Sequence, residues 1–352
     1  MKDFVDFPWS IYGTTWKWVP PFKESVRHEL SKHNPFFQHG EAQAFLAMDE
    51  DKVVGRILAS IDSHYVDAPD VRTGHFGYFE CIDDRRVADA LLAQAEAWLR
   101  AKGMTTAHGP LNLNIMMGYR IQTSGFDTDP FLGEPRSPAY YQELLKSAGY
   151  KSVSSWSSWN LSRENMQLID RTMAPVLKKE HAVEIQSFDL HNLDKEIWDF
   201  YPLAIDAYRN NYGYAKVEAE ELDLYFRPMT QFFSPGTFVR AVDRSGKAVG
   251  FTFGYWDMAE AFIAMNGDAS KLSLISQFQP KRFLFHTIAI NRELQGTTGV
   301  YQLMDALTQI TIKADAEAMG CLVKKAERTV FDKAGAPTRT YEVFAKELAD
   351  PS

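Results

Sequence analysis

The amino-acid sequence predicts an α+β protein in which two domains repeat one order of elements. The chain has 352 residues, of which 45% are hydrophobic and 24% are charged. A chain of this length and composition can bury a substantial core and is long enough for about two domains. In each half, two apolar runs flank a polar turn, a further strand follows, and a long helix then leads into another strand. Because this order of hairpin, strand, helix and strand occurs twice, we expect a duplicated domain.

The first copy lies in the N-terminal half. Its main strands are predicted at residues 45–48, 53–61, 75–81 and 105–108. Before the last of these, Asp84 can cap a helix whose apolar residues recur at three- and four-residue spacings, and Gly103 can end it. Ser137, which proline follows, predicts the start of a second helix, and a strand at 152–161 comes after it.

The second copy lies in the C-terminal half. Its strands are predicted at residues 183–188, 238–242, 248–255, 282–290, 321–326 and 341–346. A long helix with an apolar stripe is expected from about Thr298, with Gly320 as its end. The polar stretch 162–180 is expected to form a helix that connects the two domains.

Charge and cysteine content restrict the class of protein. The formal net charge is −8 and no long run of lysine or arginine occurs, so the chain lacks the overall charge that nucleic-acid binding favours. Cys81 and Cys321 have no metal-ligand or redox spacing, which fits a reduced compartment. Asp3 and Asp6 interrupt the aromatic N-terminus, so it does not resemble a signal peptide, and no stretch approaches the roughly 20 apolar residues of a membrane span. We therefore expect a cytoplasmic protein.

The element order resembles the GNAT (Gcn5-related N-acetyltransferase) fold. The resemblance implies that each domain is a twisted, mostly antiparallel mixed sheet flanked by helices, with domains at residues 1–161 and 162–352. It also implies that acyl-CoA or acetyl-CoA enters a gap between the fourth and fifth strands of the second domain. The pyrophosphate would then lie at the start of the long helix, where free N–H groups and the helix dipole stabilise an anion.

The residues between strand and helix carry this part of the resemblance. Gln295 and Gly296 match the pyrophosphate loop of the family, whereas Thr298 and Val300 stand where two later glycines are usual, so the loop is degenerate. The residues that the resemblance implies for CoA binding are Ile288, Ile290, Gln295, Gly296, Thr297, Thr298, Gly299, Val300 and Tyr301. In the first half the matching residues 80–87 contain no glycine and place carboxylates there, so we expect that copy not to bind CoA.

The first half also resembles a group of bacterial tandem GNAT-like proteins. The motifs that carry this resemblance are Asp6-Phe7-Pro8-Trp9, Trp18-Val19-Pro20-Pro21, Asn34-Pro35-Phe36-Phe37, Glu41-Ala42 with Phe45-Leu46-Ala47, Val54-Gly55-Arg56-Ile57, and Gly109-Pro110 with Asn112. Together they cover most of the first half. They identify a relative but no substrate.

The resemblance also directs attention to a few catalytic candidates. GNAT catalysis is usually a direct attack of an amine on the thioester, which needs a base for the amine and an acid for the leaving thiolate. His286 and Glu327 are the candidate bases, and Tyr301 and Tyr341 are the candidate acids. The alternatives are a hydrogen-bonded core histidine, a solvated glutamate and two packing tyrosines. We expect no metal.

The leading hypothesis is transfer of an acyl group from acyl-CoA to the amine of a small metabolite. The eroded loop is also compatible with an aminoacyl donor from charged tRNA, although the acidic balance argues against it. A non-catalytic ligand-binding protein is the third hypothesis. Residues 109–138 form too long a stretch for a plain connector and are expected to be either a substrate lip between the domains or a packed structural loop.

Overall fold

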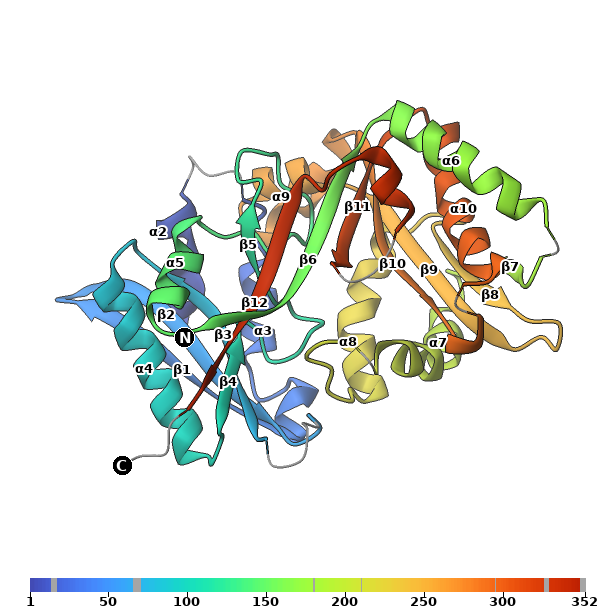
Figure 1. The fold of residues 1–352 in the computed structure, drawn as a ribbon. Helices are drawn as coiled ribbons and strands as arrows, with labels where there is room; N and C mark the ends of the chain where they lie inside the picture. The colour runs from blue at the N-terminus through green and yellow to red at the C-terminus, as the bar shows by residue number, and fades with distance from the viewer. Residues whose placement is uncertain are drawn as a thin grey trace.

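The computed structural model describes residues 1–13, 18–65, 71–179, 181–209, 211–294, 296–325 and 329–348 (Figure 1). Among these residues, twelve strands form one continuous mixed sheet. The strand order is β1-β2-β3-β4-β12-β6-β11-β10-β9-β8-β7, and β5 pairs with β12 beside this path. Most neighbouring strands are antiparallel, and the parallel pairs are β3 with β4 and β10 with β11.

The N-terminal half contains the elements predicted for the first copy. Its strands are β1 (Gly40–Asp49), β2 (Lys52–Asp62), β3 (Thr73–Cys81), β4 (Thr106–Gly109), β5 (Ile121–Ser124) and β6 (Lys151–Leu161). Its helices are α1 (Lys2–Asp6), α2 (Pro8–Tyr12), α3 (Lys23–Glu29), η1 (Pro35–Gln38), α4 (Arg85–Ala101) and α5 (Tyr140–Ser147). The predicted hairpin is confirmed as β1 and β2, and Asp84 caps α4 by accepting a hydrogen bond from the backbone N–H of Arg86.

The C-terminal half repeats this order and adds helices. Its strands are β7 (Glu184–Ser187), β8 (Phe238–Val242), β9 (Ala248–Trp256), β10 (Arg282–Ile290), β11 (Glu317–Lys324) and β12 (Arg339–Glu347). Its helices are α6 (Arg163–Leu177), α7 (Leu193–Tyr208), α8 (Ala219–Met229), η2 (Thr230–Phe232), α9 (Ala259–Met265), η3 (Ala269–Gln277), η4 (Arg292–Leu294), α10 (Thr298–Lys313) and η5 (Val330–Ala334). The predicted helix at 162–180 is confirmed as α6. A capping box between Ser162 and Asn165 stabilises its start.

The predicted end of the long helix at Gly320 is wrong. α10 ends at Lys313, and Asp315 takes the left-handed conformation there with φ of 50°. Gly320 lies inside β11, where a Cβ atom would approach the ring of Phe331 to 2.4 Å. This glycine is therefore required for close packing of the strand against η5 rather than for a helix exit.

The two halves exchange their last strands across the centre of the sheet. β12, the final strand of the chain, pairs with β4 and β5 of the N-terminal half as well as with β6. β6 in turn pairs with β11 of the C-terminal half. Figure 1 shows β12 in red extending into the blue and teal half while β6 in green extends toward the orange half. The predicted border between residues 161 and 162 falls between β6 and α6.

Aromatic side chains dominate the core on one side of the C-terminal half. The rings of Phe200 from α7, Phe226 from α8, and Phe238 and Phe251 from β8 and β9 contact one another with centroids 4.6 to 6.5 Å apart. Aromatic pairs at these spacings add about 0.5–1.5 kcal/mol each beyond the burial of their area. This core fixes α7 and α8 against the sheet.

A buried histidine of the N-terminal half makes stability sensitive to acid. His75 on β3 is 3% exposed, and burial lowers its pKa to about 3. The unfolded chain binds a proton at this residue below pH 6.5 and the folded chain does not, so stability falls with decreasing pH by about 1.4 kcal/mol per unit. We predict that, when the pH is lowered from 7 to 5, the free energy of unfolding of His75→Leu decreases by about 2 kcal/mol less than that of wild type. Urea unfolding at the two pH values measures both changes. An equal loss in both proteins would contradict the assignment.

Candidate functional site

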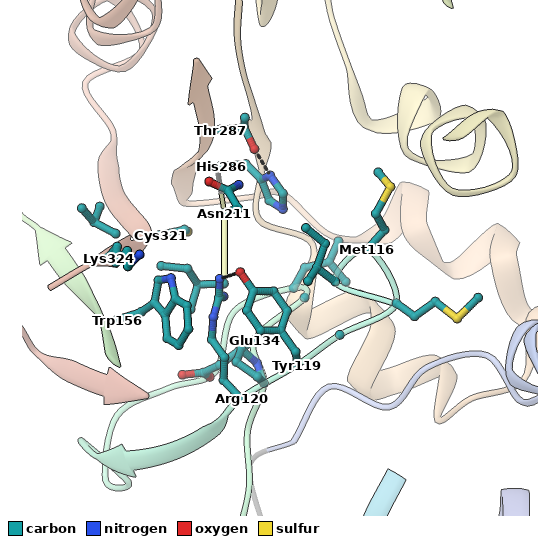
Figure 2. A pocket seen from close by; sticks show the side chains of 18 of the residues that line it. Met116, Tyr119, Arg120, Glu134, Trp156, Asn211, His286, Thr287, Cys321 and Lys324 are labelled. Atoms are coloured by element: carbon teal, nitrogen blue, oxygen red, sulfur yellow. Dashed lines mark hydrogen bonds between the residues drawn. The ribbon is translucent and has the colours of Figure 1, made fainter. Parts of the chain in front are cut away.

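A cavity of about 1080 Å³ lies between the two halves and is lined by residues of both. The N-terminal half contributes residues 115–121 and 132–137, together with Trp156 of β6. The C-terminal half contributes residues of α7, α8, β10, α10 and β11. The segment 109–138, which the sequence leaves as a lip or a packed loop, therefore lines the space between the halves. Figure 2 shows this segment facing His286 and Thr287 across the cavity.

The central feature of the cavity is a gap between two parallel strands. β10 and β11 pair only where residues 282–285 of β10 lie beside residues 317–320 of β11. Both strands then continue without pairing to each other. The residues just beyond the last pair line the cavity on both sides of the gap, namely His286, Thr287 and Ile288 on β10 and Cys321, Leu322, Val323 and Lys324 on β11. The sheet is thus open at this position.

The sequence-predicted base candidate His286 lies at the edge of this gap. The pairing register between β10 and β9 shifts between Phe285 and Thr287, so His286 is the extra residue of a β-bulge. Its ring stacks on Phe253 at 5.0 Å, and its Nδ1 atom lies 2.9 Å from Oγ1 of Thr287. Burial lowers the pKa of His286 to about 4, and the charge of Arg120 acts in the same direction. The imidazole is therefore neutral at pH 7.

The start of α10 lies at the same gap, and its residues face different ways. Gly296, Val300 and Tyr301 line the cavity, and a Cβ atom at Gly296 would meet no atom within 4 Å. Thr297 accepts a hydrogen bond from the N–H of Gly299 at 3.2 Å. One N–H group of the helix start is therefore already satisfied by the chain itself.

The other predicted CoA-contacting residues are divided between the cavity and the core. Thr298 accepts a hydrogen bond from the N–H of Ala182. Gly299 is buried against Ile290, whose Cδ1 atom would lie 2.9 Å from an added Cβ, and Ile290 is itself 8% exposed. Ile288 lines the cavity. Gln295 and the second base candidate, Glu327, lie outside the described residues.

The structure does not bring Tyr341 to the cavity. Its side chain is fully buried on β12, and its hydroxyl donates a hydrogen bond of 2.6 Å to Glu134. Burial and the charge of Glu134 raise the pKa of Tyr341 well above its usual range. Glu134 also lies 3.0 Å from Nε of Arg339 and 3.4 Å from a terminal nitrogen of Arg136. Tyr341 therefore belongs to a buried polar network that fixes β12, and Tyr301 is the acid candidate that reaches the cavity.

In the first copy, residues after β4 fill the position that corresponds to the gap of the second copy. After β4, the N–H of Leu111 donates to the carbonyl oxygen of Phe76 on β3 at 2.7 Å, and the side chain of Asn112 accepts from the N–H of Tyr78 at 2.7 Å. A Cβ atom at Gly77 would lie 2.2 Å from the carbonyl oxygen of Leu111, so the two segments are in close contact. This contact fills the space beside β3 that would correspond to the gap of the second copy.

A cationic group that the sequence does not mark as functional faces His286 across the cavity. Arg120 lies between the rings of Tyr119 and Trp156, which belong to the loop before β5 and to β6 (Figure 2). The sequence places Arg120 after Gly118 and Tyr119 in a long loop, and this pattern alone does not indicate a binding residue. The contact with Trp156 arises only in the folded chain.

Outside the cavity, a second polar cluster joins the two halves. Nδ1 of His39 lies 2.8 Å from Asp62, and its Nε2 lies 3.1 Å from Glu221 on α8. The ring of His64 stacks on that of His39 at 4.0 Å. The potential metal-ligand atoms of His39, Asp62 and His64 lie within 4.8 Å of one another, a spacing that a metal site would require. Both ring nitrogens of His39 already form hydrogen bonds to carboxylates. The cluster therefore forms an ion-paired contact between the two halves.

Comparisons with known proteins agree with this architecture. No protein-family model matches the sequence. The chain is 29% identical to Protein YghO of Escherichia coli strain K12 over 273 residues, which are 76% of this chain and 68% of that protein. It is 31% identical over 229 residues to a protein of Caulobacter vibrioides named bacterial ceramide synthase, and the match spans 64% of this chain but only 59% of that protein.

A solved structure shows the same fold over the whole chain. The tandem GNAT protein from the clavulanic acid biosynthesis pathway matches with a TM-score of 0.57 and 12% sequence identity, covering 100% of this chain and 95% of that one. Within the described residues, every helix is too short or too polar to cross a membrane. The continuous twelve-stranded sheet of the described residues, with its duplicated element order, therefore has the fold of this tandem GNAT protein.

Proposed function

We propose that this chain is an acyl-CoA-dependent N-acyltransferase whose donor enters between β10 and β11. The observation that carries the proposal is the parting of these strands at His286, which opens a lined gap beside the start of α10. The open space at Gly296 leaves room there for a donor phosphate group, and the N–H groups of the helix start favour an anion. Bound acyl-CoA would supply the activated thioester carbonyl.

In this proposal His286 is the base. A neutral imidazole is needed to accept the proton that the amine nitrogen loses as its bond to the carbonyl carbon forms, and burial keeps His286 neutral. When Nδ1 carries the ring proton and donates to Thr287, Nε2 is the accepting atom. Tyr301, which also lines the cavity, would give a proton to the sulfur as the carbon–sulfur bond breaks.

The lining of the cavity favours substrates with long apolar chains. Its volume of about 1080 Å³ lies at the upper end of the roughly 300–1,000 Å³ common for small-molecule sites. The apolar residues that line it include Ile115, Met116, Met117, Ile121, Leu132, Phe200, Leu222, Phe226, Met229, Phe253 and Phe262. The relative named bacterial ceramide synthase supports this reading, because a ceramide is the amide of a fatty acid with a long-chain amino alcohol. We therefore propose a fatty acyl donor and an acceptor amine with an apolar chain.

The test is acyl transfer with acyl-CoAs of different chain length. Purified protein is incubated with acetyl-CoA or palmitoyl-CoA and a panel of long-chain amines that differ in headgroup, and released CoA and amide product are measured by thiol assay and mass spectrometry. We expect amide from palmitoyl-CoA at a kcat/KM at least about tenfold above that for acetyl-CoA. Absence of product with every donor and amine would reject the proposed function.

A matched pair of variants tests whether the apolar cavity holds the chain. Met116 lines the cavity, whereas Met48 on β1 is 53% exposed at the surface. Met116→Trp should lower kcat/KM for palmitoyl-CoA by about tenfold or more, because added ring volume takes space from the chain. Met48→Trp should leave it unchanged. Equal effects of the two substitutions would contradict a chain-binding role for this cavity.

A further inference from the structure

We infer that the cavity contains an anion-binding subsite at Arg120, which recognises a carboxylate, sulfonate or phosphate group on the acceptor amine. The inference rests on the proposed function and adds the chemical class of the acceptor headgroup. It is carried by the geometry of the guanidinium group, by the donors that it leaves without acceptors, and by the other partners of the acidic residues in the cavity wall.

The guanidinium of Arg120 is held in a corner formed by two aromatic rings. Its Cζ atom lies 3.7 Å from the ring centroid of Tyr119 and 4.3 Å from that of Trp156. These two rings are nearly perpendicular, at 89°, with centroids 5.4 Å apart. Aromatic rings cover the faces of a guanidinium, while its N–H donors lie in the plane and point outward. Figure 2 shows the Arg120 side chain between Trp156 and Tyr119.

The donors of this guanidinium are largely without acceptors. One terminal nitrogen donates to the hydroxyl of Tyr119. The Nε–H group is enclosed and has no hydrogen-bond partner among the described residues. An enclosed polar group without a partner is rare in folded proteins, and it is most unfavourable when the group is charged. The backbone at Arg120 is also in the left-handed region, with φ of 85°, which a non-glycine residue rarely adopts.

The acidic residues of the cavity wall each have other partners. Glu134 accepts from Tyr341 and pairs with Arg339 and Arg136. Glu80 accepts hydrogen bonds from Tyr12 and Tyr141, and Glu29 accepts one from Tyr78. None of these carboxylates forms an ion pair with Arg120 within the part of the chain that the structure describes. The positive charge therefore lacks a counter-ion until a ligand provides one.

The position of Arg120 relates the anion to the reaction. Arg120 and His286 line the same cavity, and the charge of Arg120 contributes to the lowered pKa of His286, so the two groups are within electrostatic range. Lys324 of β11 also lines the cavity, and its backbone pairs with Trp156 of β6. An acceptor whose anionic group binds the in-plane donors of Arg120 thus presents a nearby amine to His286, while its apolar chain extends along the methionine and phenylalanine side chains.

The test compares two ligands that share a chain and differ in one charge. N-lauroylglycine ends in a carboxylate and N-lauroylethanolamine in a hydroxyl, and their binding to the full chain is measured by isothermal titration calorimetry without any donor. Charge-assisted hydrogen bonds contribute enough for wild type to bind the carboxylate about 10- to 100-fold more tightly. Because this measurement needs no turnover, it remains informative if acyl transfer is not observed. Equal affinity of wild type for the two ligands would overturn the inference.

Variants locate the charge that makes the difference. Arg120→Met should reduce the preference for the carboxylate to within about twofold and leave binding of the neutral ligand unchanged, since methionine keeps the apolar contact with both rings. Arg86→Met, at a side chain that is 90% exposed, should retain the wild-type preference. A preference lost in Lys324→Met but kept in Arg120→Met would overturn the assignment to Arg120. If Arg120→Met instead lowers kcat equally for anionic and neutral amines, the guanidinium serves the reacting carbonyl and the subsite is likewise rejected.

Discussion

Replacing His286 with alanine is expected to lower kcat/KM for acyl transfer by about 10²- to 10⁴-fold, the range that a positioned base contributes. The side chain lies at the bulge where β10 leaves β11, and it faces the cavity rather than the core. Its loss removes the proton acceptor for the attacking amine. Because the ring stacks on Phe253 at the cavity wall, truncation should lower the melting temperature only slightly. Initial rates and thermal unfolding are measured on the same preparations.

The pH dependence separates a base at this position from a structural histidine. Burial lowers the pKa of His286 to about 4, so the group is neutral above this value and becomes protonated only below it. The acid limb of kcat/KM that His286 causes should therefore lie near pH 4, and not near the ordinary histidine value of about 6.5. His286→Gln keeps a hydrogen-bonding side chain without a titrating nitrogen and should remain as inactive as the alanine variant. His191→Ala, at an exposed position, is the matched control. Activity of His286→Gln within threefold of wild type would show that no proton is transferred there.

Local patterns were sufficient to predict the elements that surround the gap. The hairpins, the capped helix after Asp84 and the strand that carries His286 follow from spacing and turn residues, which act over a few neighbours in sequence. The bulge could not be predicted in this way. Simple alternation places His286 on one face with Leu284, whereas the extra residue in β10 turns His286 to the cavity while Leu284 is fully buried.

Features that depend on distant pairing could not be derived from the sequence. The pairing of β12 with β4 joins residues more than two hundred positions apart, and no periodicity within β12 specifies that neighbour. The subsite at Arg120 has the same origin, because Trp156 reaches it only through the pairing of β6 with β11 and β12. The helices α7 and α8, which supply much of the apolar cavity wall, lie between the strands predicted at 183–188 and 238–242, where no helix is predicted from the sequence.

The largest loss of stability is expected from His39→Leu. His39 lies between the carboxylates of Asp62 on β2 and Glu221 on α8, and all three side chains are almost fully buried. Removing the central partner leaves two buried carboxylates close together without a counter-charge, which typically costs about 3–5 kcal/mol. Glu221 also accepts a hydrogen bond of 2.7 Å from Asn114, so the contact joins α8 to the loop that lines the cavity. Urea unfolding at pH 6 measures the loss, and His33→Leu, at an exposed histidine, is the control.

The sign of the pH dependence distinguishes this ion pair from simple packing. Burial alone lowers the pKa of His39, but the hydrogen bonds and charges of Asp62 and Glu221 outweigh it and raise the pKa above 6.5. A group with a raised pKa contributes its full stabilisation below the unfolded value and loses it as the pH rises through the folded value. The difference in unfolding free energy between wild type and His39→Leu should therefore be greatest near pH 6 and decrease toward pH 9. A difference that stays constant over this range would mean that His39 joins the halves by shape alone. A decreasing one would mean that alkaline pH weakens the contact that holds α8 against the cavity.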